Sequence, residues 1–242
     1  SRGLGDVYKR QVFFNGEFRV SQEFSPELWN PVTGEIRYLP DFKSKKGYIS
    51  LPVELEGNES AFIVFRKTNK VTEKKDNFPQ KAIVYKIDTP WKITFEAGKR
   101  GPKTPVVWSQ LKDWMDSEND SIKYFSGQAV YETTFTLEKL PQKSLYIDLG
   151  NVMVMAKVTL NGHYVGGVWI NPYRLNVTDY LREGENKLEI TVVNNWQNRL
   201  IGDQRLPEDQ RLTWTTINPW KADSSLQSSG LLGPVEIQFF DY

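Results

Sequence analysis

Residues 131–137 read Tyr-Glu-Thr-Thr-Phe-Thr-Leu, so that large apolar side chains alternate with polar ones along the stretch. A period of two is typical of a half-buried strand, because successive side chains of a strand point to opposite faces of its sheet. The same alternation recurs at residues 91–96, 144–149, 152–160, 188–192 and 235–239. Repeated strands of this kind, with turn residues between them, predict an all-β fold built as an antiparallel sandwich.

The amino-terminal part of the chain predicts a second, smaller sandwich. Asn15-Gly16 lies between two apolar runs, which predicts a two-residue hairpin turn at that point. Residues 49–55 and 61–65 have the apolar character of the last two strands of such a sandwich. A polar stretch without periodicity follows them, and we expect residues 71–77 to be a linker.

These patterns divide the chain into four expected parts. They are a non-native segment at 1–11, the C-terminal part of a β-sandwich domain at 12–70, the linker at 71–77 and a second β-sandwich at 78–242. Residues 1–11 read SRGLGDVYKRQ, with neither a starting Met nor an apolar core of a signal peptide, and they resemble an adapter scar. We therefore expect a natural protein that continues upstream. Only two short helical turns are expected, near 109–115 and 178–181.

Composition excludes several classes of function. Lys+Arg is 31 and Asp+Glu is 30, a net charge of +1, which lacks the basic excess of a nucleic-acid-binding protein. No apolar run approaches the roughly 18–20 residues that membrane insertion requires. With Cys 0 and His 1, thiolate chemistry, Cys-based zinc sites and multi-His metal centres are excluded. We also find no motif of a serine hydrolase, P-loop, zinc protease or EF-hand, and therefore nominate no catalytic residue, cofactor or metal ligand.

Four loops of the second sandwich combine tryptophan rings with amide and charged side chains. They span residues 167–174, 194–199, 203–205 and 211–220. A sugar is bound by such a mixture, because its C–H face stacks on a flat ring while planar donors and acceptors bind its hydroxyls. The candidates for carbohydrate binding or a domain interface are Trp169, Asn171, Tyr173, Arg174, Asn195, Trp196, Asn198, Arg199, Asp203, Trp214 and Trp220.

Within this set we expect Trp169 and Trp196 to stack on sugar, and the Asn and Arg side chains to bind hydroxyls. Two other interpretations stay open. The tryptophans could anchor their loops in the core while the Asn and Arg side chains cap turns. Alternatively, the same aromatic surface could pack against another protein domain.

Several longer motifs resemble known enzyme families. Asn161-Gly162, Asn171-Pro172-Tyr173 and Val177-Thr178-Asp179 resemble the sugar-binding, galactose-binding-like jelly roll of family 2 glycoside hydrolases. Residues 122–127, 198–203 and 229–234 resemble the C-terminal region of glycoside hydrolase family 106, the α-L-rhamnosidases. Residues 28–35 and 60–65 resemble the β-domain that precedes it in those enzymes. The similarity extends over nearly all of the chain after residue 11.

The resemblance implies a parent enzyme that is secreted or periplasmic in a bacterium and acts on rhamnose-containing plant polysaccharide. Its catalytic barrel would lie upstream, so no residue of this chain inherits a catalytic role. The partners would be a rhamnose-containing glycan and that missing catalytic domain. Calcium occurs in this class of enzyme, but no loop here has convincing ligand spacing. By analogy with family 2, whose jelly roll lends loop residues to the sugar site, Asp223, Ser228 and Ser229 would be rim contacts.

Three alternatives accompany this interpretation. A stand-alone carbohydrate-binding module would bind rhamnosides by itself and change its tryptophan fluorescence on titration. A purely structural interaction domain would give no sugar response and would self-associate when isolated. A complete enzyme would hydrolyse an aryl rhamnoside, which we do not expect of this chain.

Overall fold

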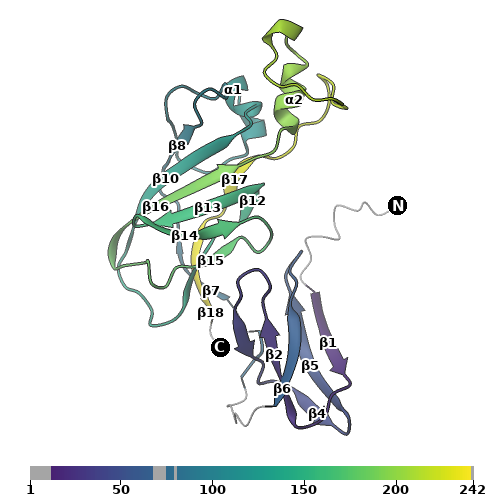
Figure 1. Cartoon of the computed structure of the whole chain (residues 1–242). Helices are drawn as coiled ribbons and strands as arrows, with labels where there is room; N and C mark the ends of the chain where they lie inside the picture. Colours follow the sequence, from purple (N-terminus) through teal and green to yellow (C-terminus); the bar gives the residue numbers. More distant parts are fainter. Residues whose placement is uncertain (1–11, 68–74, 79–80, 241–242) are drawn as a thin grey trace. The chain divides into compact units, whose positions relative to one another are not determined.

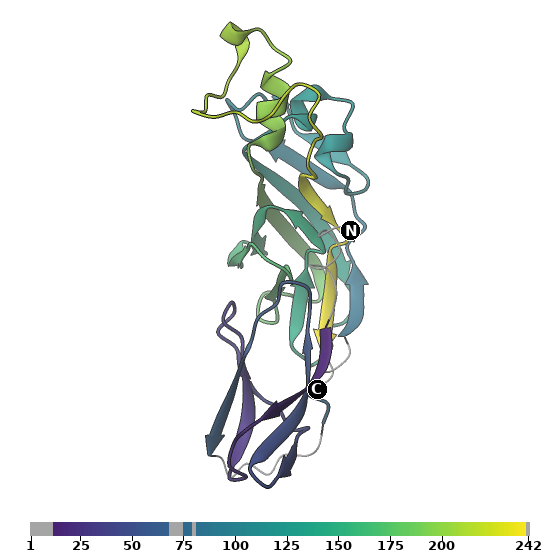
Figure 2. The same cartoon turned by 90° about the vertical axis from the view of Figure 1, so that its right-hand side faces the viewer.

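The computed structural model describes residues 12–67, 75–78 and 81–240. The chain divides into two compact units (Figures 1 and 2). Among the described residues, the first unit contains those up to Ala82 together with Ile170–Pro172 and Phe240, and the second contains Ile83–Trp169 and Tyr173–Phe239. Strands dominate both units and the helices are short, which confirms the expected all-β class. Residues 1–11 and most of the expected linker at 71–77 lie outside the described residues, so the expected boundaries stay predictions.

The first unit consists of two three-stranded sheets, ordered β1-β5-β4 and β3-β2-β6. Their strands are β1 (Val12–Phe18), β2 (Phe24–Trp29), β3 (Ile36–Tyr38), β4 (Lys43–Lys45), β5 (Tyr48–Leu55) and β6 (Phe62–Lys67). Its core contains Leu28, Leu39, Ile49, Leu51 and Val53.

The hairpin predicted at Asn15-Gly16 is wrong. β1 runs through both residues and pairs with β5 along its whole length, with Asn15 opposite Pro52 and Gly16 opposite Leu51. An Asn-Gly pair favours a tight turn only where the two flanking strands pair with each other. Here β5 takes the place of that partner, so long-range pairing overrides the local turn preference.

The second unit contains the larger set of strands. Its six-stranded sheet has the order β14-β13-β16-β10-β8-β9, a four-stranded sheet has the order β15-β11-β18-β7, and β12 pairs with β17. The strands are β7 (Lys81–Lys86), β8 (Trp91–Phe95), β9 (Val106–Trp108), β10 (Gln128–Leu137), β11 (Leu145–Asp148), β12 (Asn151–Met153), β13 (Met155–Leu160), β14 (His163–Val168), β15 (Arg174–Asn176), β16 (Gly184–Val193), β17 (Gly230–Gly233) and β18 (Glu236–Phe240).

The period-two pattern explains the core of this unit. Tyr131, Phe135 and Leu137 of β10 are buried, as the alternation predicts. β10 pairs antiparallel with β16 from Gln128 opposite Val193 to Leu137 opposite Gly184, and Leu188 and Ile190 of β16 are buried beside it. Each sheet therefore gives one apolar face to a shared core.

Two local predictions for this unit need correction. The single strand expected over 152–160 breaks at Val154, which is exposed, and β12 and β13 on either side belong to different sheets. The helical turn expected near 109–115 lies later, as η2 (Trp114–Asp116), followed by α1 (Asp120–Lys123). The turn near 178–181 is present, because Leu181 N donates to the carbonyl of Val177. Sequence reasoning missed α2 (Gln197–Asp203) and the short η3 (Glu208–Gln210).

Candidate functional site at the loop end of the second unit

Strand register brings the predicted loops to one end of the six-stranded sheet. Val193, the last residue of β16, lies opposite Gln128 at the start of β10 and opposite Met155 at the start of β13. Val168, the last residue of β14, lies opposite Ala156 at that same end. The loops after β14 and β16 therefore leave the sheet together, and Figures 1 and 2 show α1 and α2 at this end. With strands about 4.8 Å apart, the two loops begin about 10 Å from each other.

Asn194, directly after β16, fastens this end of the sheet. Its side chain accepts a hydrogen bond from Gly127 N at 3.0 Å and donates one to the carbonyl of Phe125 at 2.7 Å. The residue is buried, and both ends of its amide are used. α2 starts only three residues later, so its position relative to the sheet is set by this contact.

Asn198, on the first turn of α2, is buried and holds a distant segment. Its Nδ2 donates to the carbonyl of Gln227 at 2.6 Å, and its Oδ1 accepts from Gln227 N at 2.8 Å. Exposed Asn195 adds a third contact, donating to Gln227 Oε1 at 3.1 Å. These two predicted hydroxyl-binding amides therefore form a bridge to Gln227, a residue that sequence reasoning missed.

Asp203, at the end of α2, is a buried carboxylate with an exposed fraction of 1%. Its Oδ2 accepts three hydrogen bonds, from Leu212 N at 3.0 Å, Thr213 N at 2.9 Å and Thr213 Oγ1 at 2.6 Å. Its Oδ1 lies 3.6 Å from Arg199 Nη1, one helical turn earlier. The carboxylate thus ties residues 212–213 to the helix.

Arg199 is the charged partner of Asp203 and is itself only 6% exposed. Burial lowers the pKa of its guanidinium, and the neighbouring Asp203 carboxylate opposes that shift. Its Nη2 is buried without a hydrogen-bond partner among the described residues, and so is Asp203 Oδ1. Neither polar group faces solvent, so in this conformation both act by positioning the loop.

The tryptophans of the loop end behave differently from these amides and charges. Trp214 is 85% exposed, Trp196 67% and Trp169 59%, whereas Trp220 is half-buried. Asp223, the predicted rim contact, is exposed in the loop after Trp220. This end of the unit therefore combines exposed tryptophan rings with buried polar side chains that hold its loops together.

The loop between β14 and β15 carries the remaining predicted residues. Arg174, on β15, forms an ion pair with Asp148 of β11 at 3.1 Å, and both side chains are largely buried. Tyr173 packs against the core, and burial raises the pKa of its phenol. Asn171 is half-buried. The contacts of Arg174 and Tyr173 are those of structural residues, while Trp169 alone of this group presents a largely exposed ring.

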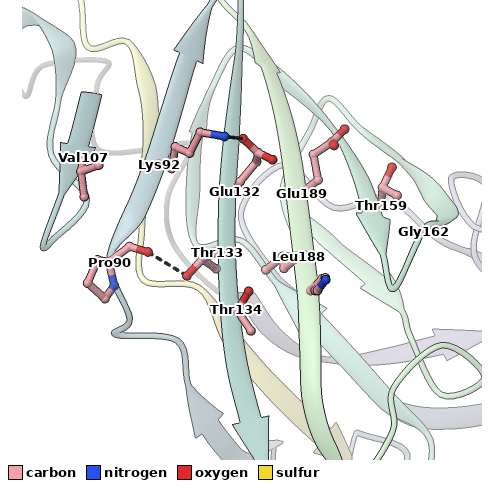
Figure 3. A pocket seen from close by; sticks show the side chains of 11 residues that line it. Pro90, Lys92, Val107, Glu132, Thr133, Thr134, Thr159, Gly162, Leu188 and Glu189 are labelled. Carbon is pink, nitrogen blue, oxygen red and sulfur yellow. Dashed lines mark hydrogen bonds and ion pairs between the residues drawn. The ribbon is translucent and has the colours of Figure 1, made fainter. Parts of the chain in front are cut away.

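A separate hollow of about 470 Å³ lies on the outward face of the six-stranded sheet (Figure 3). Lys92 of β8 pairs there with Glu132 of β10 at 2.8 Å, and Thr133 Oγ1 donates to the carbonyl of Pro90 at 2.9 Å. Its lining residues include no aromatic side chain and none of the predicted site residues. It is an open, polar sheet face without the stacking platform that a sugar site of the predicted kind needs.

The described residues can also be judged for metal binding and for membrane-spanning helices. They contain no cluster of three or more His, Cys, Asp or Glu side chains able to hold a metal ion. Among the helices of the described part of the chain, none has the length and apolar character to cross a membrane.

Comparison with known proteins shows which domain family and which enzymes this part of the chain is similar to. Residues 108–226 match the family model described as glycosyl hydrolase 2 galactose-binding domain-like. A putative β-glucuronidase of Formosa agariphila is 44% identical over 158 residues, which cover 54% of this chain and 14% of that protein. The structure of a rhamnosidase from Novosphingobium sp. PP1Y matches with a TM-score of 0.83 and 36% identity, over 96% of this chain and 22% of that one.

This chain therefore spans only a small part of the length of these two relatives, both of which are named as glycosidases. The match from 108 to 226 includes α1, β10–β16, α2 and the loop that carries Trp214. Residues 108–226 of the second unit are therefore similar to the glycosyl hydrolase 2 galactose-binding-like domain.

Proposed function

We propose that this chain is the ancillary C-terminal β-sandwich region of an α-L-rhamnosidase of glycoside hydrolase family 106. The parent enzyme would be secreted or periplasmic and would act on rhamnose-containing plant polysaccharide. In it, the second unit buttresses the catalytic domain and brings its loop end close to the sugar. The observation that carries the proposal is the likeness to the Novosphingobium rhamnosidase, which extends over 96% of this chain at 36% identity.

The two relatives carry the names of different glycosidases, and coverage favours the rhamnosidase. The likeness to the putative β-glucuronidase is higher in identity but covers 54% of this chain, whereas the rhamnosidase matches nearly all of it. A match through both units supports a shared arrangement of domains better than a match that leaves much of the chain uncovered. We therefore assign the parent to the rhamnosidase type.

An ancillary role also agrees with the chemistry of the loop end. A glycosidase needs two carboxyl groups on either side of the scissile bond, one of which must exchange a proton. Asp203 is buried, and its Oδ2 already accepts three hydrogen bonds. This carboxylate therefore serves to hold residues 212–213 in place. We assign catalysis to the catalytic domain that this region supports.

The exposed indoles favour one second candidate, a carbohydrate-binding module that acts by itself. Trp169 and Trp196 would stack on sugar rings, with Asn195 and Asp223 near their hydroxyls. Aromatic rings of this kind are also common at protein interfaces, so exposure alone supports both functions.

Two measurements on the isolated chain test these functions. We expect no hydrolysis of aryl α-L-rhamnoside or aryl β-D-glucuronide, and hydrolysis of either would contradict an ancillary role. Titration with rhamnose, glucuronic acid and rhamnogalacturonan oligosaccharides is followed by tryptophan fluorescence. If Trp169→Ala and Trp196→Ala leave both folding and any measured affinity unchanged, the stacking assignment of these two rings is wrong.

A further inference from the structure

One short helix holds both ends of the loop that carries Trp214. At the first end, Asp203 binds the backbone and hydroxyl of Thr213. At the second end, Asn198 binds both backbone groups of Gln227. Because 213 and 227 are fixed to the same helix, residues 214–226 form a closed loop of the length of an Ω loop, a type that is frequently functional. We call residues 214–226 the aromatic arm.

Three polar side chains of the arm form hydrogen bonds within it. Thr215 Oγ1 donates to the carbonyl of Ile217 at 2.9 Å, and Asn218 Oδ1 accepts from Trp220 N at 3.0 Å. Ser224 Oγ accepts from Lys221 N at 2.9 Å. These local bonds hold the shape of the arm and reduce the number of side-chain groups that remain for a hydroxyl-rich ligand.

Apolar side chains of the same segment face outward instead. Ile217 is 79% exposed, Trp214 is more exposed still, and Leu212 at the first end of the arm is also exposed. Branched aliphatic side chains neither stack as flat rings nor bind hydroxyls, so they add nothing to a sugar site. Three exposed apolar side chains within six residues of the chain, one of them a tryptophan, are typical of a protein-binding surface.

We infer that the aromatic arm docks into an apolar, concave protein surface on the catalytic domain of the parent enzyme, with the Trp214 indole as the anchor. Asn198 and Asp203 are positioning residues, which hold the arm in its docking shape before contact. The inference rests on the proposed function, because it takes its partner from the larger enzyme. In the matching rhamnosidase, the equivalent of this region is 22% of the chain, so such a region has a large remainder to contact.

Radical footprinting can measure the docking residue by residue. The probe is a hybrid in which this chain replaces the equivalent region of the Novosphingobium rhamnosidase. Hydroxyl-radical oxidation of Trp214 and Ile217, read by mass spectrometry, is compared between the hybrid and the isolated chain. We expect both residues to react readily in the isolated chain and to lose most of that reactivity in the hybrid. Exposed Tyr164 on β14 serves as the reference for radical dose.

Several results would overturn the inference. Equal oxidation of Trp214 in the hybrid and the isolated chain would show that the arm stays in solvent. Protection in the isolated chain that grows with protein concentration would identify a second copy as the occupant. Protection by rhamnose or its oligosaccharides would identify a sugar. A hybrid without rhamnosidase activity, beside an active parent enzyme, would contradict the proposed function itself and remove the partner named here.

A double substitution provides a second, independent test. Trp214→Ala with Ile217→Ser should shift the melting temperature of the isolated chain by no more than about 2 °C, because exposed side chains contribute little to its stability. In the hybrid the same substitution should lower the melting temperature further and restore oxidation of Leu212. Tyr164→Ala is the control for loss of an exposed ring, and an equal shift in both proteins would contradict docking.

Discussion

At the scale of single residues, the predicted site separates into positioning and contacting side chains. Asn198 and Arg199 are predicted to bind hydroxyls because amides and guanidinium groups suit that role, and Asp203 is a candidate for carbohydrate binding or a domain interface. The structure buries all three and uses Asn198 and Asp203 to hold other segments of the same unit. Their direct contact with sugar stays a prediction, whereas their contacts within the unit are visible in the structure.

Asp203→Asn tests the role of the buried carboxylate. The substitution leaves Arg199 as a buried charge without its counter-ion, and loss of one partner of a buried ion pair costs about 3–5 kcal/mol. We expect a loss of that size in the free energy of unfolding, measured by urea denaturation. The exposed Asp209→Asn should change it by less than about 0.5 kcal/mol. Equal effects of the two substitutions would show that the Asp203 contacts contribute nothing specific.

Tyr131 supplies a second prediction, from the centre of the core. Its hydroxyl oxygen accepts hydrogen bonds from Trp114 Nε1 at 2.6 Å and from Leu231 N at 3.2 Å. Tyr131→Phe leaves both buried donors without their acceptor, at a cost of about 1–3 kcal/mol for each unpaired group. We expect a melting temperature several degrees lower, and an unchanged melting temperature would contradict this role.

The same residue predicts a change of stability with pH. Burial raises the pKa of the Tyr131 phenol above its ordinary value, so the folded chain keeps its proton more strongly than the unfolded chain. Stability from this group is therefore complete below about pH 10 and is lost as the pH rises above it, by up to about 1.4 kcal/mol per unit. Urea denaturation at pH 8 and pH 11 measures the loss, which should be smaller in Tyr131→Phe than in the unsubstituted chain.

At the scale of elements, α2 is the feature that sequence reasoning could not find. Its seven residues are too few for a clear helical period, and it buries the polar Asn198 and Asp203 as well as the apolar Leu200 and Ile201. The contacts that define it join residues far apart in sequence, such as Asn198 and Gln227. The amide-rich composition of residues 194–199 therefore indicates a candidate binding loop. It does not indicate that the Asn194 and Asn198 side chains are buried.

Strand elements show where local patterns suffice and where they fail. β8, β10 and β16 follow from alternation alone, because one face of each is buried in the shared core. Asn15-Gly16 and the break at Val154 do not follow from it. Long-range pairing decides both, since β1 pairs with β5, and β12 and β13 join different sheets.

Asn198→Leu tests α2 as the holder of the aromatic arm. The change removes both hydrogen bonds to the Gln227 backbone, so amide exchange at Gln227 and proteolysis within 214–226 should become faster while β10 and β16 stay protected. Asn195→Ala, which removes one hydrogen bond to the Gln227 side chain and one from Gln197 N at an exposed position, should change both rates much less. Uniformly faster exchange through the sheets would instead indicate that Asn198 supports the whole unit.

At the scale of the whole molecule, the chain contains two β-sandwich units. Its all-β class is the one that the sequence predicts. The sequence predicts a galactose-binding-like β-sandwich at 78–242, and the family match to residues 108–226 lies within that range. The named relatives with this region are a rhamnosidase and a putative β-glucuronidase. Fold and function are separate questions here, since one fold serves many activities.

The most direct test of an ancillary role is the rhamnosidase activity of the Novosphingobium enzyme in three forms. In the first its equivalent region is intact, in the second that region is deleted, and in the third this chain replaces it. We predict that deletion abolishes activity towards an aryl α-L-rhamnoside and that replacement by this chain restores it. A replacement as inactive as the deletion, beside a fully active intact enzyme, would contradict the account.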